Sequence, residues 1–100
     1  MKRAPTASES RHMGRVAALG CVVCRNLGFG ETPAQVHHIR EGVGAAQRAP
    51  NWLTIPLCPM HHTGPLGYHA LRAAAFERMY GATELDLLSQ TLEELYGDRK

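Results

Sequence analysis

Residues 58–62 read Cys-Pro-Met-His-His, and residues 21–24 read Cys-Val-Val-Cys. In each motif two residues separate a pair of metal-binding side chains, a spacing that lets a tight turn direct both toward one tetrahedral ion. The four expected ligands, which include every cysteine of the chain, are Cys21, Cys24, Cys58 and His61. The spacing therefore predicts a structural zinc ion that ties the two motifs together.

Two other interpretations of the cysteines stay open. The first pair could be a redox motif with Cys58 unrelated to it, although no strand–helix context for thioredoxin-like chemistry surrounds it. All three could also be buried, inert thiols. An odd number of cysteines disfavours a disulfide framework. No apolar segment typical of a signal peptide follows the N-terminus, and no run approaches the roughly 18 apolar residues of a membrane span. We therefore expect a reducing cytoplasm and no membrane partner.

Length and charge suggest one small domain with a polyanionic partner. The first ten residues are polar and basic, so we expect a disordered tail over 1–10 and a single domain over 11–97. A core of this size often needs a metal or disulfides. Residues 1–68 carry seven Lys/Arg and three Asp/Glu, a net charge of +4, whereas residues 69–100 carry four and six, a net charge of −2. The basic part favours a nucleic-acid contact, and a merely solvated face is the alternative.

Apolar periodicity and turn residues predict a small α+β fold. A helix is expected over 10–19, two strands over 35–40 and 52–57, and irregular chain over 58–67. Two helices should close the chain, one over 68–80 ended by Gly81 and one over 83–96 capped by Thr83. The buried stripe of the last helix is expected to contain Leu85, Leu88, Leu92 and Leu95.

Four histidines remain once His61 is assigned and His12, near the expected tail, is set aside. They are His37, His38, His62 and His69. Because alternate residues of a strand face opposite sides, one of the adjacent pair can ligate a metal while the other faces a substrate. Ordinary surface or core imidazoles are the alternative.

These residues carry a family resemblance. Val-His-His-Ile-Arg at 36–40, Asn51, the 58–62 motif and His69 together resemble an HNH nuclease. The segments 17–24, 37–49, 54–62 and 76–88 resemble more closely the phage-encoded Ref-type nucleases, which act with RecA. The resemblance implies a treble-clef-like ββα-metal fold with a structural zinc and C-terminal helices. It also implies a metal-dependent endonuclease that hydrolyses DNA, encoded by a phage or prophage in a bacterial cell.

The resemblance also implies roles for individual residues. His38 would be the general base and Asn51 the residue that orients it. His37, where many HNH proteins have an aspartate, would bind the catalytic metal with His62 and His69. Many HNH enzymes place their last two histidines about one helical turn apart, whereas seven positions separate them here. Which of the two binds the metal is therefore open, and Mg²⁺, Mn²⁺ and Zn²⁺ are all candidates for that metal.

Basic and polar residues near these histidines are candidates for DNA contacts. They are Arg40, Gln47, Arg48 and Arg72. A further set near the N-terminus would add a non-specific, salt-sensitive contact and consists of Lys2, Arg3, Arg11 and Arg15. The resemblance implies a single-stranded or displaced DNA strand near a RecA filament as the substrate.

Two other functions stay open on the residues alone. A non-catalytic zinc module that binds nucleic acid explains the cysteines, His61 and the basic part of the chain, but leaves the other histidines unexplained. A protein-interaction zinc domain would dock through its acidic helix at 83–96. Metal-dependent nicking of a plasmid separates the nuclease from both.

Overall fold

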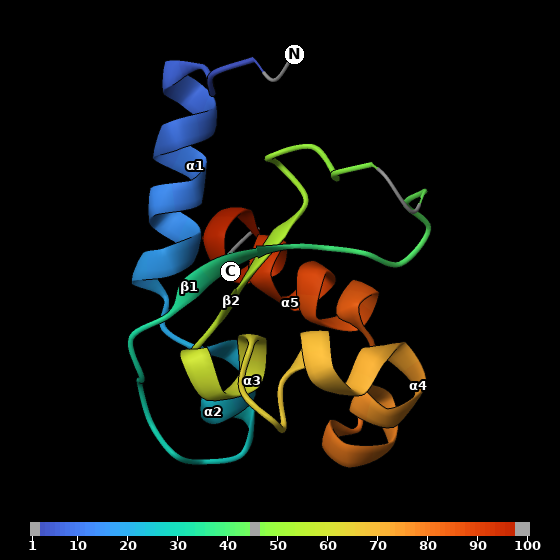
Figure 1. The fold of residues 1–100 in the computed structure, drawn as a ribbon. Coiled ribbons are helices and arrows are strands. Elements are labelled where there is room, and N and C mark those ends of the chain that lie inside the picture. The colour runs from blue at the N-terminus through green and yellow to red at the C-terminus, as the bar shows by residue number, and fades with distance from the viewer. Residues whose placement is uncertain (1–2, 45–46, 98–100) are drawn as a thin grey trace.

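A two-stranded antiparallel hairpin lies at the centre of the fold, with β1 (Gln35–His38) paired to β2 (Thr54–Leu57) (Figure 1). The structure, a computed structural model, describes residues 3–44 and 47–97. His37 lies opposite Ile55 and His38 opposite Thr54. All four residues of β2 are buried. Both expected strands are therefore present, and each is two residues shorter than predicted.

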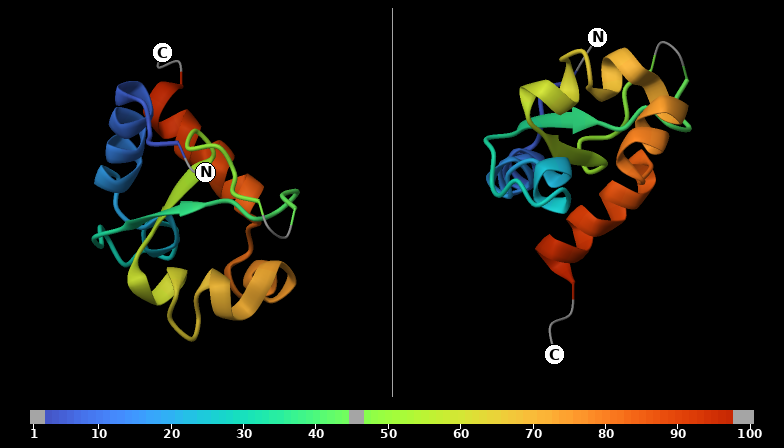
Figure 2. Two further views of the ribbon diagram at one scale, coloured as in Figure 1. Left: turned by 45° about the horizontal axis from the view of Figure 1, so that its top comes forward. Right: turned by 90° about the horizontal axis from the view of Figure 1, so that it is seen from below.

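Helices cover both sides of the hairpin. They are α1 (Ala7–Ala18), α2 (Val22–Asn26), α3 (Pro59–His62), α4 (Tyr68–Tyr80) and α5 (Glu84–Tyr96). Figure 2 shows α3 and α4 on one side of the hairpin and α1 and α2 on the other, with α5 extending along the α1 side. Both α1 and α5 contact β2 and each other. The largest buried side chains, among them Phe76, Ile55, Leu57 and Leu87, form the core between these layers.

Helix α1 begins earlier than the sequence analysis predicted. Ala7 to Ser10 form its first turn, so the expected disorder up to Ser10 is wrong for these residues. Thr6 is the N-cap: its side chain accepts from the backbone N–H of Glu9, and the Glu9 carboxylate accepts from the Thr6 N–H at 2.7 Å. This capping box satisfies two backbone donors and starts the helix despite its polar sequence. Arg3 also pairs with Glu9 at 3.2 Å.

The segment after β2 is more ordered than expected. Four residues of the stretch predicted to be irregular form α3, which starts with Pro59 at its first position, where a missing N–H costs nothing. Helix α4 has the predicted bounds and ends at Gly81, whose φ of 75° is the left-handed conformation that glycine favours. Arg72 interrupts α4 with φ 67° and ψ 177°, which makes a kink.

The buried face of α5 differs from the predicted leucine stripe. Leu87, Leu88 and Thr91 are buried, whereas Leu85 is 49% exposed. Glu84, the first residue of the helix, is also buried. The elements together make a small α+β fold of one hairpin and five helices within the described residues. None of those helices is long and apolar enough to cross a membrane.

Candidate active site

The first candidate site is a buried cluster of three sulfurs and one imidazole, contributed by Cys21, Cys24, Cys58 and His61. The Nδ1 atom of His61 lies 3.3 Å, 3.5 Å and 3.6 Å from the sulfurs of Cys58, Cys21 and Cys24. The sulfurs of Cys24 and Cys58 are 3.8 Å apart. Ligands around a tetrahedral ion with bonds of ~2.1–2.3 Å lie about 3.4–3.8 Å apart. The donor set therefore fits a structural metal ion.

Local structure and electrostatics both suit a cation in this cluster. Cys21 caps α2, and its sulfur accepts from the backbone N–H of Cys24 at 3.4 Å. Cys58 caps α3, which places His61 one helical turn away. Burial raises the pKa of Cys21 to about 11, although backbone hydrogen bonds from Cys58 and Cys24 oppose the rise. Thiolates packed this closely would repel one another, and a bound cation would offset that repulsion.

The second candidate site is the three-histidine cluster, formed by His37 of β1, His62 of α3 and His69 of α4. One ring nitrogen of each lies within 4.8 Å of the other two. The Nε2 atoms of His62 and His69 are 3.1 Å apart. Two ligands of one ion with bonds of ~2.1 Å are about 3.0–3.4 Å apart. Both histidines therefore converge as the ligands of one ion would, despite their separation in sequence.

A glycine allows this convergence. A Cβ built on Gly67 would lie 2.7 Å from both the carbonyl carbon and the carbonyl oxygen of His62. Real Cβ atoms do not approach backbone atoms so closely, so only glycine fits where the chain turns from α3 into α4. Gly67 is also the N-cap of α4, which places His69 in the first turn of that helix.

Two residues that the sequence analysis did not single out for the site orient these rings. His37 Nε2 lies 2.5 Å from Glu84 Oε2, and His62 Nδ1 lies 2.7 Å from Gln35 Oε1. Each oxygen accepts a hydrogen bond from the ring nitrogen that it faces, so that nitrogen carries the proton. That leaves the other nitrogen with its lone pair for a metal. Glu84 is 47 positions from His37, so no local motif links them.

His38 lines the same cavity as the three-histidine cluster and has a separate hydrogen-bond partner. Its Nε2 donates to Asn51 Oδ1 over 2.8 Å. Burial lowers the pKa of His38, and that of His69, below the ordinary imidazole value. Burial also lowers the pKa of His62 to about 4, with nearby His37 and His69 adding to the effect. These rings are therefore neutral near pH 7, the form that binds metals and accepts protons.

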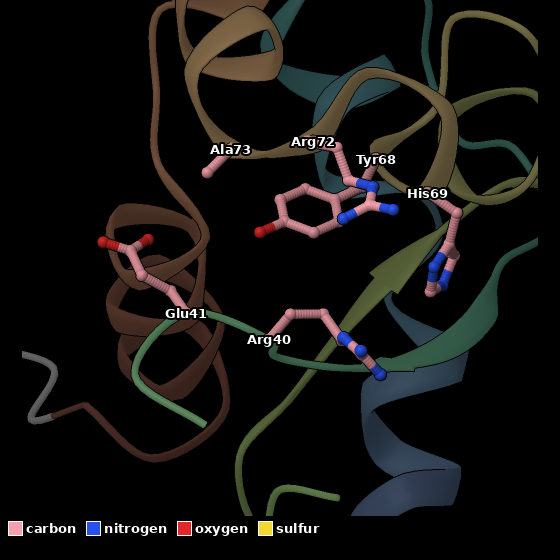
Figure 3. A pocket seen from close by; sticks show the side chains of 6 residues that line it. All are labelled: Arg40, Glu41, Tyr68, His69, Arg72 and Ala73. Carbon is pink, nitrogen blue, oxygen red and sulfur yellow. The ribbon is translucent and has the colours of Figure 1, made fainter. Parts of the chain in front are cut away.

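Basic side chains surround the histidines in adjoining cavities. One cavity of about 260 Å³ is lined by Val36, His37, His38, Arg40, Arg48, His62 and His69. A second of about 430 Å³ shares Arg40 and His69 with it and adds Glu41, Tyr68, Arg72 and Ala73. Figure 3 shows the side chains of Arg40, Arg72 and His69 directed into this cavity beside the Tyr68 ring. Three of the four expected DNA-contact residues thus adjoin the cluster, whereas Gln47 lies on an exposed loop and lines neither cavity.

The N-terminal basic residues are distributed differently. Arg3 lines a third cavity of about 390 Å³ together with Arg48 and Asn51. Arg15 reaches the hydroxyl of Tyr96 at 3.5 Å, and Arg11 is exposed on α1. Lys2 lies outside the described residues. His12, set aside in the sequence analysis, is buried against Trp52 and Tyr96 and belongs to neither metal cluster.

Comparison with known protein families finds a match over nearly the whole chain. Residues 5–99 match the model of a family described as recombination enhancement, RecA-dependent nuclease. No curated protein matches the chain. The matched region covers nearly the whole sequence, including both candidate clusters and the His38–Asn51 pair. The chain therefore belongs to the family of RecA-dependent nucleases of recombination enhancement.

Proposed function

We propose that the protein hydrolyses DNA phosphodiester bonds with one divalent ion bound by His37, His62 and His69. The observation that carries this proposal is the His38–Asn51 hydrogen bond of 2.8 Å, which places an oriented, neutral imidazole beside the three-histidine cluster. A bound Mg²⁺, Mn²⁺ or Zn²⁺ ion would neutralise charge on the phosphate and stabilise the leaving oxygen. Membership of a nuclease family favours this over a non-catalytic zinc module or a protein-interaction domain.

His38 acts as the general base in this proposal. Asn51 Oδ1 accepts the Nε2 proton, which leaves the lone pair on Nδ1 to take a proton from water. The oxygen of that water forms a bond to phosphorus as the bond to the leaving oxygen breaks. The lowered pKa of His38 keeps the ring unprotonated, and so available as a base, near neutral pH.

The two clusters have different tasks in the proposed architecture. The hairpin and α4 form a ββα-metal unit, and the cluster of Cys21, Cys24, Cys58 and His61 holds a structural zinc in a treble-clef-like arrangement. Thiolate and imidazole ligands in a closed tetrahedral site are typical of zinc. Such an ion contributes on the order of 10 kcal/mol to folding. It fixes α2 against α3 and thereby holds His62 beside β1.

DNA binds along the basic rim of the cavities. Arg40, Arg48 and Arg72 contact phosphates near the cleaved bond, and Arg3 extends the contact past Asn51. Gln47 adds a contact from the exposed loop just before Arg48. The family description supports a RecA filament as the partner. A single-stranded or displaced strand is the substrate that such a filament presents.

A nicking assay tests the proposal. Supercoiled plasmid is paired with a RecA-coated oligonucleotide, and the protein is added with Mg²⁺, Mn²⁺ or Zn²⁺. We expect metal-dependent cutting that requires RecA and that falls by about 10²-fold or more in His38→Ala and less in Asn51→Ala, with fold and metal content unchanged. Met60→Ala, an exposed change on α3, is the matched control. Full activity of His38→Ala, or cutting without divalent metal, contradicts the mechanism.

A further inference from the structure

We propose that Glu84 is a positioning residue of the catalytic centre, whose carboxylate holds His37 in the tautomer and orientation that present Nδ1 to the metal. The inference rests on the proposed three-histidine metal site and adds to it a residue from the far end of the chain. Glu84 is the first residue of α5, whereas His37 lies in β1.

The surroundings of Glu84 stabilise a buried carboxylate. Glu84 is only 1% exposed. Both carboxylate oxygens accept from the backbone N–H of Arg40 at 2.9 Å, and Oε1 also accepts from the N–H of Glu41 at 2.7 Å. Oε2 faces His37 Nε2 at 2.5 Å. The position at the N-terminus of α5 adds a favourable dipole. The buried charge is stable here because each of these contacts donates a hydrogen bond to it.

The two sets of contacts have separable consequences. The backbone contacts hold the turn after β1, which is a structural task. The contact with His37 forces the ring proton onto Nε2 and leaves the lone pair on Nδ1, since the carboxylate can only accept. Because Nε2 of His37 is hydrogen-bonded to Glu84, Nδ1 is the His37 atom that is left to bind a metal. His62 Nδ1 likewise has an oxygen partner, Gln35 Oε1, at 2.7 Å.

Glu84→Gln distinguishes these tasks. Its amide oxygen can still accept from Arg40 and Glu41, so the turn is kept. Its amide NH₂ group then faces His37 Nε2 and favours the opposite tautomer, in which Nδ1 carries the proton and cannot bind a metal. We therefore expect a folded protein whose three-histidine site is weakened. Glu93→Gln, an exposed change on the same helix, is the matched control.

Two measurements that do not depend on activity test the inference. Nitrogen NMR of the imidazole rings, with the cysteine cluster loaded and no other metal, should show the His37 proton on Nε2 in the native protein and on Nδ1 in Glu84→Gln. Mn²⁺ titration of the zinc-loaded protein should show about 10–100-fold weaker binding in Glu84→Gln. His37→Ala should weaken Mn²⁺ binding as much alone as together with Glu84→Gln, because Glu84 acts through His37.

The outcomes separate this inference from the proposed function. Mn²⁺ binding that is lost in His37→Ala but unchanged in Glu84→Gln overturns the role of Glu84 and leaves the metal site standing. A native protein that binds no Mn²⁺ at the cluster overturns both. If Glu84→Gln does not fold, the NMR result on the native protein still decides, because a His37 proton on Nδ1 there contradicts the inference.

Discussion

The Nε2 atoms of His62 and His69 lie 3.1 Å apart although the residues are seven positions apart on different helices. The turn between α3 and α4 makes this possible because the backbone of Gly67 packs directly on the end of α3. The distance between these two nitrogens therefore depends on the absence of one methyl group.

Gly67→Ala should separate the two histidines and weaken Mn²⁺ binding at the three-histidine cluster. The added Cβ would lie 2.7 Å from the carbonyl carbon of His62, and backbone atoms cannot move aside cheaply. We expect at least about tenfold weaker binding and about 1–3 kcal/mol of lost stability. Titration with Mn²⁺ and thermal unfolding measure the two effects.

Gly14→Ala is the matched control for that experiment. Gly14 lies in α1 with nothing within 4 Å of an added Cβ. An alanine there should stabilise the helix by up to about 1 kcal/mol and leave Mn²⁺ binding unchanged. If Gly67→Ala also binds Mn²⁺ normally, the turn does not set the distance between His62 and His69.

Removal of the structural metal should unfold the protein. Cys58→Ser, or a strong chelator, takes away an ion that contributes on the order of 10 kcal/mol to folding, more than most small domains can lose. Circular dichroism and thermal unfolding report the loss, and metal analysis should find one tightly bound zinc. Met60→Ala changes an exposed residue within the same motif and should unfold normally. A chelated protein that keeps its melting temperature contradicts the structural role of the metal.

Arg72→Gly should make the protein more stable and less able to bind DNA. Arg72 has φ 67° and ψ 177°, a conformation that glycine adopts readily and other residues only at a cost of about 1–3 kcal/mol. Part of that gain is offset by the greater freedom of glycine in the unfolded chain. We expect a net gain of about 1 kcal/mol, or a rise of about 4–8 °C in melting temperature.

DNA affinity should move in the opposite direction, because the Arg72 side chain faces the cavity next to His69. The slope of the logarithm of affinity against the logarithm of salt concentration should become shallower by about the amount of one phosphate contact. Arg72→Lys keeps the charge and the strained backbone, so it should retain most of the affinity without the gain in stability. Loss of stability in Arg72→Gly means that the kink carries no strain.

Burial of His12 should make stability fall at mildly acidic pH. Its Nδ1 lies 2.8 Å from the Tyr96 hydroxyl, and burial lowers its pKa below the ordinary value of ~6.5. The unfolded chain therefore takes up a proton at higher pH than the folded protein. Stability that is present above pH ~6.5 is lost as the pH falls below that value.

His12→Gln isolates this effect from the other histidines. Glutamine keeps a polar partner for Tyr96 but does not titrate. Melting temperatures of the zinc-loaded proteins between pH 7.5 and 5.5 should fall less steeply in the variant than in the native protein. Parallel curves for the two proteins mean that protonation of His12 does not contribute.

Several features of this protein were readable from local sequence because their physical causes are local. Ligands two residues apart can share an ion wherever they occur, so the four-ligand cluster followed from spacing. Gly81 ended α4 at the predicted residue because it adopts the left-handed conformation. The start of α1 also has a local cause, the capping box of Thr6 and Glu9. The polar composition of the first ten residues instead indicates disorder, so the prediction begins the helix too late.

Tertiary structure decided the rest, because burial and contact depend on what packs opposite. The sequence alone determined that His37, His38, His62 and His69 lie near the predicted structural metal motif. Only the fold brought His37 to Glu84, 47 positions away, and turned Leu87 rather than Leu85 into the core. A residue's chemistry is set by its own side chain, but its partner is set by the chain segments that packing places beside it.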